Sequence, residues 1–232
     1  DDYVQRAKQK IRSDGNKSND FQPNIDEVEA IAEDLYIEDR VNANYELQSK
    51  INEQANLNIT LGRVQSKEDS YKYIDNIIDE VRSDLTNAGQ SEEFIESQVE
   101  KIKLAKEGIR NGNNGLNFSP VIIDGKEVTK DYSLVVVDNA VKNNKLQVGT
   151  HEIGHAIFTK LLGTNSQDFA PLAEAIVDYL STVEGGNDVL TRILVRDRQA
   201  SQMADELVMN FLEEVGNNNV PLDPRFAALF GR

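Results

Sequence analysis

The 232-residue chain contains no cysteine and no tryptophan, and it has only two histidines and two methionines. Without cysteine there is no disulfide framework, and any metal site must be built from histidine and carboxylate side chains. The apolar runs are far too short to cross a bilayer. The chain begins Asp1-Asp2, without a methionine or an apolar signal segment. We therefore expect a piece of a longer protein, or a chain whose leader has been removed.

Positive charge is also scarce. The sequence has 40 acidic residues against 25 basic ones, which gives a net charge of −15. This charge repels nucleic-acid phosphates and anionic lipids, so we expect neither nucleic acid nor membrane as a partner. The length suits either one large domain or a catalytic domain with an appendage, and the oligomeric state stays open.

Hydrophobic spacing divides the chain into three parts. Residues 1–20 are rich in turn formers and are interpreted as an arm or linker. Residues 21–115 form a helical segment, because apolar side chains recur there at helical spacing. Residues 116–232 begin with a small sheet at 120–137, with a hairpin turn at Asp124-Gly125, and continue as helices. The predicted fold class is α+β, predominantly helical, with the small sheet packed on the helix that follows it.

The most informative motif is His151-Glu152-Ile153-Gly154-His155, within a predicted helix from Gln147 to Leu162 that Gly163 would end. Histidines four residues apart lie on one face of a helix and can bind one Zn²⁺ together. Two histidines and a correctly placed glutamate coincide by chance in about 7 of 10,000 such sequences, which weighs against two unrelated surface or core histidines. Gly154 is costly inside a helix, and we expect a neighbouring strand to approach closely there.

A catalytic zinc needs a third protein ligand and an open fourth position. With no other histidine and no cysteine, the third ligand must be an oxygen, and Glu174 on the next predicted helix is the best candidate. Asp178, one turn later, could accept the N–H of either ligand histidine and fix its tautomer. The competing interpretation of these two acids is a solvated helix face or a cap pair.

Glu152 is the predicted general base. It lies beside the first histidine, where its carboxylate can take a proton from a zinc-bound water and pass it to a leaving amine. Amide hydrolysis is therefore the natural reaction. A structural zinc would require a fourth protein ligand, and no spare histidine or cysteine exists to supply one.

At these residues the chain resembles the gluzincin, or thermolysin-like, zinc metallopeptidases. Eighteen residues separate His155 from Glu174, and Glu174 to Asp178 is similar to that group's glutamate-x-x-x-aspartate element. The resemblance covers about residues 147–182. It implies a zincin-like catalytic domain, zinc on His151, His155 and Glu174, Glu152 as the base, and a peptide or protein as substrate. The metzincin pattern fails, because phenylalanine and leucine stand where it requires glycine and histidine.

Two departures refine what the resemblance implies. Thermolysin uses a further histidine to stabilise its transition state, and here Tyr132, Tyr179 or Arg192 would have to polarise the scissile carbonyl. The aminopeptidase motif Gly-Ala-Met-Glu-Asn is absent, which favours an endopeptidase. In such enzymes an edge strand pairs with extended substrate, and we expect the 120–137 sheet to supply it.

The segment from Asn139 to Phe158 is also similar to metallopeptidase-like segments of very large phage proteins. That similarity favours a cytoplasmic or virion-associated location. The alternative to an enzyme is a non-enzymatic interaction or virion protein whose histidine motif is inactive or structural. A hydrolase with another substrate class, and an inhibitory role of residues 1–110, also stay open.

Overall fold

The computed structural model describes residues 2–18, 21–54, 56–146, 148–162, 166–196, 200, 202–217, 219–220 and 225–229. Its α-helices are α1 (Asp2–Asp14), α2 (Ile25–Gln54), α3 (Lys67–Asn87), α4 (Glu92–Arg110), α5 (Val137–Lys142), α6 (Val148–Leu162), α7 (Ala170–Thr182), α8 (Gly186–Arg196) and α9 (Ala204–Gly216). Its strands are β1 (Ile59–Val64), β2 (Gly115–Phe118), β3 (Ile122–Ile123), β4 (Lys126–Glu127) and β5 (Asp131–Val136), and η1 (Ser166–Phe169) and η3 (Phe226–Leu229) are short 3₁₀ turns. The predicted α+β, predominantly helical class is confirmed.

The main sheet has the strand order β1-β5-β2. Strand β1 pairs parallel with β5, and β2 pairs antiparallel with it. The sequence prediction placed only helix in the region of β1, which was wrong: residues 59–64 form a strand, and its pairing with β5 joins the helical segment to the predicted catalytic part. The predicted boundary at residue 116 consequently falls inside β2. The two edges of this sheet are β1 and β2, with β5 in the centre, so neither edge comes from the 120–137 region.

The predicted turn at Asp124-Gly125 is confirmed. Strands β3 and β4 pair as a separate two-stranded hairpin. Asp124 and Gly125 have positive φ values of 51° and 75°, as the two central residues of a type I′ turn require. Glycine takes this conformation without strain, and aspartate tolerates it better than most residues.

Side-chain alternation along β5 gives the sheet two buried faces. Tyr132, Leu134 and Val136 pack with α3 and α4 in one apolar cluster. Val135 points to the opposite face, where it packs with side chains of α2 and α5. This period-two pattern is the normal geometry of a strand covered on both sides, and it leaves α6 on the face that carries Val135.

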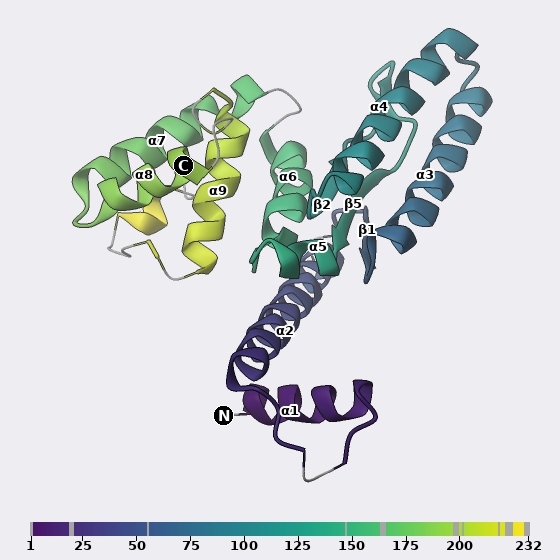
Figure 1. Ribbon diagram of the computed structural model, residues 1–232. Helices are drawn as coiled ribbons and strands as arrows, with labels where there is room; N and C mark the ends of the chain where they lie inside the picture. The colour runs from purple at the N-terminus through teal and green to yellow at the C-terminus, as the bar shows by residue number, and fades with distance from the viewer. Residues whose placement is uncertain are drawn as a thin grey trace.

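Helix α6 lies between the sheet and a C-terminal helical lobe (Figure 1). It contacts β2 and β5 on one side and α9 on the other. The lobe has its own core, built on fully buried side chains such as Ile176 of α7, Ile193 of α8 and Phe211 of α9. The histidine helix is thus sandwiched, and residues on its α9 side meet a helix from the far end of the chain.

The N-terminal residues form more structure than an arm. Helix α1 packs against the first half of α2, and Ala7, Ile11, Val28 and Ala32 form a small buried cluster there. Figure 1 shows this pair at the end of α2 remote from α6, while the other end of α2 reaches α5, and α2 also contacts α6. No helix in the described ranges is both long and apolar enough to cross a membrane.

Candidate metal centre

Helix α6 forms as predicted from Val148 to Leu162, while the expected ends Gln147 and Gly163 lie outside the described residues. Gly154 permits a close approach, but the neighbour is a helix rather than the expected strand. A Cβ at Gly154 would lie 2.7 Å from Met209 Sδ of α9. The missing side chain therefore lets α9 pack close against the histidine helix, where the strand prediction was wrong.

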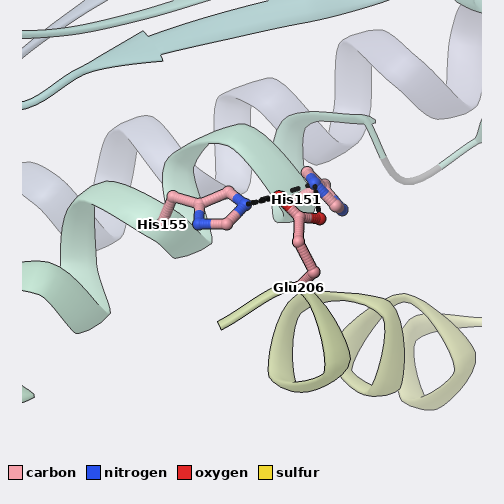
Figure 2. Close-up of side chains that lie close together, drawn as sticks. All are labelled: His151, His155 and Glu206. Carbon is pink, nitrogen blue, oxygen red and sulfur yellow. Dashed lines mark hydrogen bonds and ion pairs between the residues drawn. The ribbon is translucent and has the colours of Figure 1, made fainter. Parts of the chain in front are cut away.

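The close packing brings Glu206, in the first turn of α9, to the two histidines (Figure 2). His155 Nε2 lies 3.3 Å from His151 Nε2. Glu206 Oε2 lies 3.4 Å from His151 Nε2, and its Oε1 lies 3.5 Å from His155 Nε2. These three residues are the only group of histidine, cysteine and acidic side chains in the described part of the chain that could hold a metal ion.

The spacing of the ligand groups suits one bound ion. At zinc–ligand distances of about 2.0–2.1 Å, tetrahedral geometry places neighbouring ligand atoms roughly 3.3–3.4 Å apart. The two imidazole Nε2 atoms lie 3.3 Å apart, and each faces a different oxygen of the Glu206 carboxylate, at 3.4 and 3.5 Å. One ligand atom from each residue lies within 4.8 Å of the other two. The side chains of His151, His155 and Glu206 are 18%, 15% and 17% exposed, so the group is sheltered but reachable. The donor set of two imidazoles and one carboxylate leaves a fourth position open.

Charged side chains surround the two histidines and shift the pKa values of His151 and Glu206. Burial lowers the pKa of His151, but contacts with the carboxylates of Glu206 and Glu213 outweigh burial and raise it to about 10. Burial raises the pKa of Glu206, but contacts with His151 and His155 lower it well below its usual range. His151 and Glu206 therefore form an ion pair, which a dication would replace by displacing the imidazole proton.

Glu213 stands behind the first histidine. Its Oε1 lies 2.9 Å from His151 Nδ1, and its side chain is only 8% exposed. Because Nε2 faces His155 and Glu206, Nδ1 is the ring nitrogen that a supporting carboxylate must contact. The sequence prediction placed Asp178 beside a ligand histidine, whereas in the structure Glu213 lies there, at ion-pair distance but without the alignment of a hydrogen bond.

Glu152 lies where α6 meets the edge strand. A Cβ at Gly115, the first residue of β2, would lie 2.6 Å from Glu152 Cγ and 2.5 Å from the Leu134 carbonyl oxygen. Only glycine leaves room for the glutamate beside the strand. Burial raises the pKa of Glu152, which the two histidines oppose. Glu152 and His151 line a cavity of about 190 Å³ together with Asn114, Lys145, Val148, Asn210 and Glu213.

Glu174 and Asp178 are not brought to the histidines. Both are exposed on α7, where they line a separate cavity of about 470 Å³ with Tyr179 and Arg225. Their exposed position agrees with the competing interpretation of these two acids, a solvated helix face. The eighteen-residue spacing placed Glu174 on the next helix along the chain, but the fold brings α9 to the histidines at this point.

The three side chains considered for polarising a substrate carbonyl are engaged elsewhere. The Tyr132 hydroxyl donates to Glu80 Oε2 at 2.7 Å, on the side of the sheet opposite α6. Tyr179 is buried in the core of the C-terminal lobe. Arg192 donates to Glu214 Oε2 at 3.1 and 3.2 Å. The polar side chains beside Glu152 come instead from Asn114, Lys145 and Asn210.

A pattern in α9 could have identified Glu206 and Glu213. Along this helix Glu206, Asn210 and Glu213 stand at i, i+4 and i+7, on one face, among Leu207, Val208 and Phe211. Asn210 and Glu213 are buried. Polar side chains rarely lie in such an apolar stretch unless they have partners, so the stripe marked a buried polar site.

The chain was compared with protein-family models, curated proteins and solved structures. No protein-family model, curated protein or solved structure matches it.

Proposed function

We propose that the chain is a zinc-dependent endopeptidase whose metal ligands are His151, His155 and Glu206. The observation that carries the proposal is the meeting of three groups that bind zinc: the two histidine Nε2 atoms lie 3.3 Å apart, and the Glu206 carboxylate faces both of them through its two oxygens, at 3.4 and 3.5 Å. Three protein ligands with an open fourth position are typical of catalytic zinc sites, whereas structural sites are closed by four.

Zinc bound there would lower the pKa of water and polarise a substrate carbonyl. Glu152 would accept the proton of the attacking water and deliver it to the leaving nitrogen. Its position supports this role, because it follows a ligand histidine and lines the adjoining cavity. Burial raises the pKa of Glu152, which makes its carboxylate a stronger base toward the attacking water.

The edge strand offers a place for the substrate backbone. Among the described residues, strand β2 pairs only with β5, and its first residue lies against Glu152. An extended peptide added along the free edge of β2 would gain main-chain hydrogen bonds and pass beside the base. Because the edge of β2 can pair with an internal segment of a substrate peptide, this mode of binding suits an endopeptidase.

Two measurements test the proposal. Zinc content of purified protein should be stoichiometric, and a peptide library should be cleaved by the wild type and not by Glu152→Gln. The Glu174→Gln variant is the matched control, since this exposed acid should affect neither result. Absence of stoichiometric zinc from the wild type after zinc loading would refute the site. Zinc binding without hydrolysis of any peptide would favour the non-enzymatic alternative.

A further inference from the structure

The cavity beside Glu152 contains two hydrogen-bond donors that the proposed reaction does not use. Lys145 follows α5, and Asn114 immediately precedes β2. Both side chains line the cavity with Glu152 and His151. The two side chains come from loops that are distant in sequence, and the fold places both of them next to the proposed reaction centre.

Neither donor is used within the described part of the chain. Lys145 makes no side-chain hydrogen bond or ion pair there, although Glu152 and Glu213 line the same cavity. The Asn114 amide oxygen accepts a hydrogen bond from Asn143 Nδ2 at 2.6 Å. This bond fixes the orientation of the amide, and its NH₂ group has no acceptor among the same residues. The chain has a net charge of −15, so acidic partners for a lysine are abundant, and the Lys145 ammonium is nevertheless unpaired among the described residues.

The two loops are held by an asparagine network. Asn143 Nδ2 also donates to the Gly112 carbonyl at 2.8 Å, and Asn139 Nδ2 donates to the Asn113 carbonyl at 2.7 Å. The Lys145 amide donates to the Ala140 carbonyl at 2.8 Å, which closes the end of α5. Both donors therefore start from fixed backbone, and preorganised donors bind an anion with a smaller loss of entropy.

We propose that this cavity is a substrate subsite in which Lys145 and Asn114 bind a carboxylate next to the bond that is cleaved. In an endopeptidase this carboxylate belongs to an acidic side chain of the peptide, whereas a terminal carboxylate in the same place would make the enzyme a carboxypeptidase. The cavity of about 190 Å³ has room for one such group. A lysine ammonium and an amide N–H that reach one anion from the wall of a cavity would give charge-assisted hydrogen bonds. The assignment rests on the proposed peptidase function.

The test uses fluorescein-labelled peptides in which one position at a time is Glu or Gln, each made with a free or an amidated C-terminus. Cleavage gives kcat/KM, and fluorescence anisotropy gives binding to the metal-free protein. The wild type should prefer one carboxylate over its neutral counterpart by about tenfold or more, as expected for hydrogen bonds to a charged group. Preference for Glu identifies a side-chain subsite, and preference for the free acid identifies a terminus subsite.

The matched variants are Lys145→Met, Lys145→Arg and Lys142→Met. Lys145→Met should reduce the preference to about twofold or less, because the ammonium is lost while the stem length is kept. Lys145→Arg should retain it, and so should Lys142→Met, which removes an exposed charge from the end of α5. Retention in Lys145→Arg excludes a folding defect as the cause.

Two results would overturn the subsite: equal treatment of acidic and neutral peptides by the wild type, or an unchanged preference in Lys145→Met. Failure of the peptidase proposal is distinguishable from both. If no peptide is cleaved but anisotropy shows a carboxylate preference that Lys145→Met abolishes, the anion site stands and only the hydrolysis is lost.

Discussion

His151 Nδ1 lies 2.9 Å from Glu213 Oε1, and the same helix, α9, that supplies Glu213 also supplies Glu206 on the other side of the imidazole ring. One helix therefore both completes the metal group and orients its first histidine. The orientation and basicity of a ligand imidazole depend on the partner of its second nitrogen. The position of α9 against α6 is accordingly the main structural requirement of the site.

The first prediction concerns Glu213. Glu213→Gln should weaken zinc binding by about 10–100-fold, because a neutral amide supports the imidazole less well than a carboxylate. Competition with a chelator of known affinity measures the change. Glu214→Gln is the control, since Glu214 is an equally buried acid of α9 that contacts Arg192 instead. Equal zinc affinities for Glu213→Gln and the wild type would remove Glu213 from the site.

The second prediction separates the two candidates for the third ligand. Glu206→Gln should lose stoichiometric zinc, because an amide oxygen is a far weaker zinc ligand than a carboxylate. Glu174→Gln should keep it, since Glu174 is exposed on α7. Zinc analysis after gel filtration gives the answer for both proteins. The reverse pattern, with zinc lost only from Glu174→Gln, would restore the spacing-based assignment.

The sequence predicted features that depend on neighbouring residues better than features that depend on distant ones. The helix that carries His151 and His155, the Asp124-Gly125 turn and the helix beginning near Pro171 follow from local patterns. Strand β1 was missed because its stability comes from parallel pairing with β5, across an intervening 66 residues. Such a short strand carries little signal of its own.

The site was predicted in part for the same reason. Two ligand histidines four residues apart are a local signal, whereas Glu206 lies fifty-one residues beyond His155. Which later helix returns to the histidines depends on how α7, α8 and α9 pack, and spacing contains no information on that packing. Gly154 and Met209 form the close contact between α6 and α9. Neither a glycine nor a methionine by itself indicates which helix packs against it.

The third prediction follows from that contact. Gly154→Leu should push α9 away from α6, because even a Cβ at this position would lie 2.7 Å from Met209 Sδ. We expect a loss of about 1–3 kcal/mol in the free energy of unfolding from overpacking, and zinc binding weakened by about tenfold or more as Glu206 moves. Urea unfolding and chelator competition measure the two effects.

The double variant Gly154→Leu with Met209→Ala provides the control. Removing the methionine side chain makes space for the leucine, so zinc affinity should recover toward that of Met209→Ala alone. A double variant in which the losses simply add would show that the two residues do not compete for the same space.

The fourth prediction concerns a buried acid remote from the metal group. Asp131, at the start of β5, is 2% exposed, and neither of its side-chain oxygens has a hydrogen-bond partner within the described ranges. Lys160 of α6 lies 3.8 Å away, a loose contact. Burial raises the pKa of Asp131 to about 6, and Lys160 offsets only part of this effect.

A carboxyl whose pKa is higher in the folded state binds a proton more tightly there, so the folded state loses stability as pH rises from about 4 to about 6. Asp131→Asn should therefore raise the free energy of unfolding by about 1–3 kcal/mol at pH 7.5, with little gain at pH 4. Urea unfolding at both pH values measures this. Asp124→Asn, in the exposed turn, should change neither. Destabilisation of Asp131→Asn at pH 7.5 would show instead that the contact with Lys160 outweighs the cost of burying the charge.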